Sequence, residues 1–137
     1  MAPPLVLVDT GPLVAWFDRG DGAHARCRSF FAATRRPLVT TWPVLTEVCH
    51  LVPAHVVVPF MGFVAQSGIA VDRIDAGAAV DIAVMMAKYA DVPMDLADAS
   101  LVWLAGSLRV SEVATLDRAD FGIYRLPGGK RLTNLLA

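Results

Sequence analysis

Short apolar runs alternate along the chain with longer segments whose apolar residues recur at helical spacing. Runs at 5–8, 38–41, 69–74 and 113–116 predict strands, and the segments at about 13–19, 21–34, 43–52, 75–89 and 95–108 predict helices. The first run, four aliphatic residues between prolines and Gly11-Pro12, is typical of a strand buried on both faces. Strands separated by helices predict right-handed crossovers, and therefore an α/β fold: a three-layer α/β/α sandwich around a mainly parallel sheet.

Two segments are ambiguous. The segment 53–67 holds Val56, Val57 and Val58, which favour a strand, but its later apolar residues recur at helical spacing, and we expect a helix. In the tail, the apolar pairs around the turn 127–129 suggest a hairpin at the edge of the sheet.

Composition narrows the class of protein. With 137 residues, 55% of them hydrophobic and 18% charged, we expect a single domain over 1–137 that has a large core or an oligomer interface. The stretch 48–71 contains no charged residue, but its prolines, glycines and histidines favour a buried or dimer-forming pair of helices over a membrane helix. Two cysteines without a C-x-x-C spacing and no recognisable signal peptide are typical of the cytoplasm. The three tryptophans are expected in the core.

Four acidic residues stand where an acidic site needs them, although the net charge is only −1. Asp9 and Asp117 directly follow predicted strands, so in a parallel sheet both lie at its carboxyl edge. Glu47 is the sole charged residue between Arg36 and Asp72, in an otherwise apolar helix. Asp98 lies early in another apolar helix. Carboxylates brought together repel one another unless a cation joins them, and oxygen ligands without paired histidines or cysteines favour Mg²⁺, or Mn²⁺, over zinc.

Several neighbours of these acids have two interpretations. Asp9 is also suited to a turn, and Asp95, one helical turn before Asp98, is better explained as a helix cap. Thr10 and Thr115 either orient a metal-bound water or simply end their strands, while Asp120 is either a turn residue or a support for Asp117. A separate set, the arginines, could bind phosphate groups or lie on solvated surfaces: Arg19, Arg26 and Arg118.

The ordered set of motifs resembles the PIN-domain ribonucleases, and most closely the VapC toxins of toxin–antitoxin pairs. The matching segments, in order, are 7–10 (LVDT), 45–48 (LTEV), 94–101 (MDLADASL) and 114–121 (ATLDRADF). The resemblance implies a PIN-like fold and Mg²⁺-dependent endoribonuclease activity, with Asp9, Glu47, Asp98 and Asp117 as the acidic quartet. It also implies a homodimer held by helices, here the stretch 43–67, and inhibition by a small antitoxin that inserts near the site.

Three other functions remain open. An aspartyl-phosphate phosphatase would use Asp9 as its nucleophile, but it requires a second aspartate at position 11, where this chain has glycine. A signalling receiver domain requires a lysine near the acidic pocket, and neither Lys88 nor Lys130 is well placed for that role. The third alternative is a PIN-like module retained for binding without catalysis, which the complete set of acids disfavours.

Overall fold

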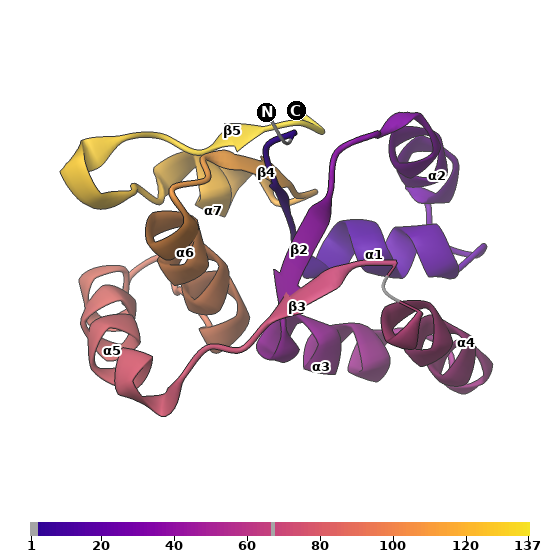
Figure 1. Ribbon diagram of the computed structural model, residues 1–137, viewed down its shortest axis with the longest axis horizontal. Helices are drawn as coiled ribbons and strands as arrows, with labels where there is room; N and C mark the ends of the chain where they lie inside the picture. The colour runs from indigo at the N-terminus through magenta and orange to yellow at the C-terminus, as the bar shows by residue number, and fades with distance from the viewer. Residues whose placement is uncertain (1–2, 67) are drawn as a thin grey trace.

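The computed structural model describes residues 3–66 and 68–137 and contains a five-stranded parallel sheet flanked by helices (Figure 1). The strand order is β3-β2-β1-β4-β5, and every neighbouring pair is parallel. The strands are β1 (Val6–Val8), β2 (Leu38–Thr41), β3 (Ala70–Asp72), β4 (Glu112–Ala114) and β5 (Thr133–Asn134). The predicted α/β/α architecture is thus confirmed.

The helices cover the two faces of the sheet unequally. Four lie on one side in Figure 1: α1 (Thr10–Phe17), α2 (His24–Ala33), α3 (Trp42–Leu51) and α4 (Ala54–Ala65). The other side carries α5 (Ala79–Lys88), preceded by the 3₁₀ turn η1 (Ala76–Ala78), together with α6 (Leu96–Leu108) and α7 (Arg118–Ile123). A second 3₁₀ turn, η2 (Pro127–Gly129), precedes β5. Because every neighbouring pair of strands is parallel, the carboxyl ends of all five strands lie at the same edge of the sheet.

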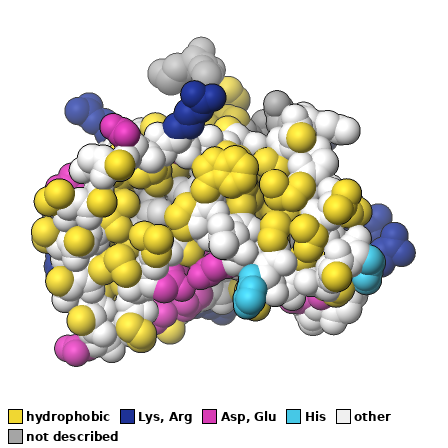
Figure 2. Space-filling model, turned by 90° about the horizontal axis from the view of Figure 1, so that it is seen from below, with side chains coloured by type: hydrophobic (Ala, Val, Ile, Leu, Met, Phe, Trp, Pro, Cys, Tyr) yellow, Lys and Arg dark blue, Asp and Glu magenta, His cyan; other side chains and the backbone are white. Residues whose placement is uncertain are grey.

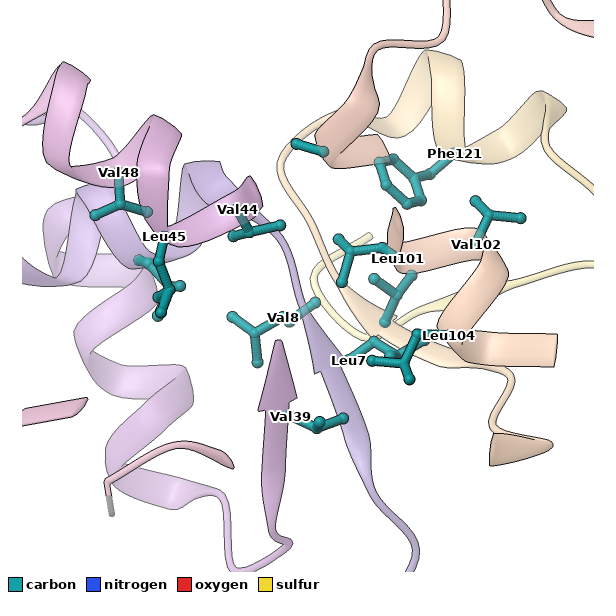
Figure 3. Packing of buried hydrophobic residues seen from close by; sticks show 14 of the residues in the cluster. Leu7, Val8, Val39, Val44, Leu45, Val48, Leu101, Val102, Leu104 and Phe121 are labelled. Atoms are coloured by element: carbon teal, nitrogen blue, oxygen red, sulfur yellow. The ribbon is translucent and has the colours of Figure 1, made fainter. Parts of the chain in front are cut away.

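Both faces of the central strands are buried, which explains the uninterrupted apolar run at the start of the chain. Leu7, Val8 and Val39 lie between residues of α3 on one side and of α6 on the other (Figure 3). The residues of β1 are 1% exposed or less. At about 25 cal/mol for each Å² of apolar surface removed from water, this central layer is a major source of stability.

Some of the expected elements need correction. The segment after Pro53 is helical, as predicted, and forms α4, although its expected end at Ser67 lies outside the described residues. In the tail, a single antiparallel bridge joins Arg125 and Arg131 across the turn, outside the strands of the sheet. The expected hairpin is therefore not the sheet edge: the edge is β5, which pairs parallel to β4 and which the sequence does not indicate. Its two residues are too few to show an alternating pattern.

Other corrections concern burial. Trp42 is 52% exposed, so its expected place in the core is wrong. This residue is the first of α3 and directly follows Thr41, which caps the helix. Among the described residues, no helix is long and apolar enough to span a bilayer.

Candidate active site

Asp9 is the most buried acid of the candidate site. It directly follows β1 and precedes α1, but its carboxylate does not cap that helix through a side-chain hydrogen bond among the described residues. Instead, the Thr115 hydroxyl donates to Asp9 Oδ2 at 2.7 Å, and Asp9 is only 7% exposed. The contact joins the ends of β1 and β4 and favours a role for Asp9 beyond a turn.

Glu47 reaches the same region from α3. That helix begins at Trp42 because the Thr41 hydroxyl accepts a hydrogen bond from the Val44 amide at 3.4 Å. One turn of helix later, Glu47 Oε1 accepts a hydrogen bond of 3.0 Å from the Thr10 hydroxyl. The threonine that follows Asp9 in the sequence therefore orients the acid that comes from a different element.

Asp98 is held from two sides on α6. Asp95 occupies the N-cap position, and its carboxylate accepts a hydrogen bond of 2.8 Å from the Asp98 amide, which confirms that Asp95 is a helix cap. The Asp98 carboxylate in turn accepts a hydrogen bond of 2.9 Å from the phenol of Tyr124. The sequence does not predict this contact, because Tyr124 lies 26 positions after Asp98 and no local spacing connects the two residues.

Asp117 and Asp120 form the last part of the site. Asp117 caps α7 by accepting a hydrogen bond of 3.0 Å from the Asp120 amide, and its own amide donates to the Thr115 hydroxyl at 3.0 Å. Thr115 thereby connects Asp9 and Asp117. The cap does not exclude Asp117 from the acidic site, because only one carboxylate oxygen caps the helix and the residue also lines the cleft that the other acids share.

These residues line one open cleft of about 410 Å³. Seven carboxylates contribute to it, and the described part of the chain supplies no lysine or arginine to its lining. The seven are Asp9, Asp21, Glu47, Asp95, Asp98, Asp117 and Asp120. Figure 2 shows acidic side chains gathered on the face that contains the cleft, between apolar areas. The sequence did not single out Asp21, which lies in the loop before α2.

The concentration of carboxylates changes their proton affinities. Burial, partly offset by the Thr115 hydrogen bond, raises the pKa of Asp9. Burial and then the nearby Asp95 charge raise the pKa of Asp98 to about 7. Burial and the adjacent Asp95 carboxylate also raise the pKa of Glu47. Each shift shows that the ionised form is disfavoured where no positive charge compensates it.

The donor set fits a hard divalent cation. The charged groups of the cleft are carboxylates, and the described residues place neither histidine nor cysteine in its lining. Over residues 3–66 and 68–137, no three acidic, histidine or cysteine side chains approach closely enough to enclose an ion by themselves. Mg²⁺ does not require such a cage, because it retains several waters and binds through one or two carboxylates.

The three arginines considered for phosphate binding lie outside the cleft lining. Arg19, Arg26 and Arg118 are exposed to solvent. The structure therefore brings together the acids and both threonines but not these arginines, whose contact with RNA stays a prediction.

Comparison with known proteins finds a relative by sequence and a solved structure of similar fold. No family model matches the chain. The chain is 33% identical over 132 residues to Ribonuclease VapC26 of Mycobacterium tuberculosis, and the match covers 93% of this chain and 98% of the relative. Among solved structures, it resembles the crystal structure of M. tuberculosis VapC20, described as a Sarcin-Ricin loop cleaving toxin, with a TM-score of 0.75 and 14% identity. That match covers 83% of this chain and 91% of VapC20 and supports the fold alone.

Proposed function

Because the chain belongs to the VapC family of PIN-domain ribonucleases, we propose that it is a Mg²⁺-dependent endoribonuclease and the toxin of a toxin–antitoxin pair. The observation that carries this proposal is the cleft lined by seven carboxylates without lysine or arginine among its described residues. When ionised, a cluster of this kind destabilises the folded protein unless it binds a cation. A cation bound there would also attract the phosphate groups that the acids alone repel.

We propose that Asp9, Asp98 and Asp117 hold the cation, directly or through water, and that Glu47 completes the site. A bound Mg²⁺ would activate water and stabilise the charge that develops on the phosphodiester, and Mn²⁺ could substitute for it. The Thr10 hydroxyl keeps one oxygen of Glu47 occupied, which orients the carboxylate. In the metal-free protein, burial and the Asp95 carboxylate raise the pKa of Glu47, and a cation bound beside it would lower that pKa and favour the ionised form.

The test is RNA cleavage by purified variants. Asp9→Asn preserves size and removes the charge, and it should abolish cleavage in Mg²⁺ while the circular dichroism spectrum stays unchanged. Asp81→Asn is the matched control, because Asp81 is exposed on α5, away from the cleft. Undiminished cleavage by Asp9→Asn would refute the assignment. If the wild-type protein binds RNA but does not cleave it, the alternative of a binding module without catalysis is favoured.

The protein should also form a homodimer. Trp42 and Leu96, each 52% exposed, flank an apolar cleft of about 350 Å³ between α3, α5 and α6. On α5, Val80 and Val84 are also largely exposed, one helical turn apart. Val80 and Val84 lie on a different side of α5 from Ile82 and Met86, which line that cleft, so the exposed apolar surface extends around the helix. Exposed large apolar groups are typical of a protein interface. The sequence predicts an interface within 43–67. The surface proposed here combines the start of that stretch, at Pro43, with residues of α5.

Light scattering of two variants tests the position of the interface. Val84→Lys should convert the dimer to a monomer, because it places a charge at the centre of the α5 surface. Val58→Lys, on the exposed side of α4 and inside the predicted stretch, should remain dimeric. The reverse result would move the interface to α4. A wild-type protein that is monomeric at every concentration measured would refute the dimer.

The same acidic cleft suits an antitoxin that presents a basic side chain. A lysine or arginine inserted among the carboxylates would neutralise them and occupy the position proposed for the cation, which would inhibit the enzyme. We expect the antitoxin to be a small protein, and both partners to act in the cytoplasm.

A further inference from the structure

Three carboxylates of the cleft each accept one hydrogen bond from a side-chain hydroxyl. Thr115 donates to Asp9, Thr10 donates to Glu47, and Tyr124 donates to Asp98. Thr10 directly follows Asp9 and Thr115 lies two positions before Asp117, whereas Tyr124 is the residue at the end of α7. Resting on the proposed function, we propose that Tyr124 is a positioning residue, which orients the Asp98 carboxylate so that one oxygen is free to face a divalent cation.

Packing fixes the position of the Tyr124 ring. The residue is 0% exposed, and its ring makes edge contacts with Tyr89 and Phe121, each at 5.2 Å between ring centroids. In a core of this density, the ring cannot move without displacing both neighbours. The hydroxyl therefore stands at a defined point, 2.9 Å from Asp98 Oδ2.

The backbone around Tyr124 is anchored as well. The Tyr124 amide donates to the Asp120 carbonyl at 3.1 Å, within the helix that Asp117 caps. On the other side, the Arg125 amide donates to the Tyr89 hydroxyl at 3.0 Å. The short segment 117–125 thus carries one candidate ligand, Asp117, and positions another, Asp98, so that their relative placement is determined by a single helix.

A neutral donor is the appropriate one at this place. The terminal torsion of an aspartate is broad, so one strong hydrogen bond is needed to select an orientation of its carboxylate. Lysine or arginine would also supply such a bond, but its positive charge would neutralise the carboxylate and reduce its attraction for a metal ion. The phenol orients Asp98 and leaves its charge available to the cation.

The variant Tyr124→Phe removes the hydroxyl and retains the ring. Its matched control is Tyr89→Phe, which removes the hydroxyl of the neighbouring buried ring. That hydroxyl accepts a hydrogen bond from the Arg125 amide and, among the described residues, makes no bond to an acid. Groups that orient metal ligands typically change metal affinity 10- to 100-fold. We therefore expect calorimetric titration with Mn²⁺ alone to show about 10-fold weaker binding for Tyr124→Phe. Tyr89→Phe should show a clearly smaller loss, because it removes only one backbone anchor beside Tyr124 and leaves the phenol on Asp98 in place. Cleavage by Tyr124→Phe should recover at high Mg²⁺, with an unchanged KM for RNA.

A second measurement uses the wild-type protein and does not depend on the folding of a variant. The chain has two tyrosines, Tyr89 and Tyr124, so ¹³C labelling at the phenol carbon gives two signals, which Tyr89→Phe assigns. Addition of Mg²⁺ should shift the Tyr124 signal and leave that of Tyr89 in place.

The possible outcomes separate the two proposals. Normal Mn²⁺ affinity in Tyr124→Phe, or equal losses in both variants, would overturn the role of Tyr124 while the wild-type enzyme stays active and metal-dependent. A Tyr124 signal that does not respond to Mg²⁺ would overturn it too. A wild-type protein that binds no Mn²⁺ and cleaves no RNA would refute the proposed function together with the role of Tyr124.

Discussion

At the amino edge of the sheet, Arg36 pairs with Glu112 at 2.7 Å and also donates to the carbonyls of Pro4 and Leu5, at 3.0 and 3.4 Å. At the carboxyl edge, seven carboxylates share one cleft whose described lining contains no basic side chain. The amino edge joins β1, the start of β2 and β4 through compensated charges. The carboxyl edge brings the ends of the same strands together with charges of one sign.

The pKa shifts at the two edges have opposite directions. The hydrogen bond from Arg36 lowers the pKa of Glu112, whereas burial and neighbouring acids raise the pKa of Asp98 to about 7. An ion pair at the amino edge stabilises the fold, while the acids at the carboxyl edge reduce its stability when they are ionised. We infer that the second arrangement is retained for the binding of a cation, at a cost in stability.

Among the changes that test this comparison of the two edges, Asp98→Asn should have the largest effect. This variant should reduce RNA cleavage at least about 100-fold, since the loss of a metal ligand exceeds the effect of the groups that support ligands. In EDTA at pH 7.5 it should increase the free energy of unfolding, because it removes a buried charge that neighbouring acids repel. Urea unfolding measures this change, and a less stable Asp98→Asn would contradict the comparison. Asp95→Asn, which can still cap α6, should give a smaller loss of cleavage.

Mg²⁺ should stabilise the wild-type protein. A ligand present at 100 times its Kd raises the free energy of unfolding by about 2.7 kcal/mol. Thermal unfolding with Mg²⁺ and with EDTA should therefore give a clear increase in Tm for the wild type and little or none for Asp98→Asn. Equal shifts in both proteins would show that the ion acts elsewhere on the chain.

The pH dependence of stability should differ between the edges. Asp98 binds a proton more tightly in the folded state, because its pKa is raised from 3.8 to about 7. Its contribution to the free energy of unfolding of the metal-free protein therefore falls as the pH rises through this range. Glu112 has a lowered pKa, so its contribution is present above its ordinary value of 4.5 and is lost as the pH falls below it. Urea unfolding in EDTA at pH 5 and pH 7.5 should show the decrease, and Asp98→Asn should weaken it. A wild-type protein more stable at pH 7.5 would contradict this account.

The smallest effect is expected at the amino edge. Arg36→Ala removes a partly exposed ion pair and two hydrogen bonds to carbonyls, which together contribute about 1–2 kcal/mol. Stability should fall by that amount, while RNA cleavage below the unfolding transition stays at the wild-type rate. A large loss of cleavage would show that the two edges are coupled.

The sequence predicts the architecture because strand and helix periods are strong in this chain. The buried runs around Leu7 and Val113, with helices between them, are sufficient to indicate a parallel sheet, and a parallel sheet places Asp9 and Asp117 at one edge. Glu47 and Asp98 are found because a charge is conspicuous in an apolar helix. The assignment of these four as catalytic residues stays a proposal.

The remaining features depend on contacts that no local pattern encodes. Thr115 and Tyr124 act on acids that lie 106 and 26 positions away, so neither spacing nor residue type reveals the pairing. The composition of the segment does not indicate that Trp42, the first residue of α3, is exposed. Likewise, β5 forms because Glu112 and Val113 offer it a partner in the sheet.

Metal-dependent cleavage of RNA by the purified protein tests the central claim most directly. A defined RNA is incubated with wild-type protein in excess EDTA, and Mg²⁺ is then added beyond the chelator. We predict no cleavage in EDTA and rapid cleavage at discrete sites once Mg²⁺ is free. Cleavage that continues at an undiminished rate in EDTA would contradict the account.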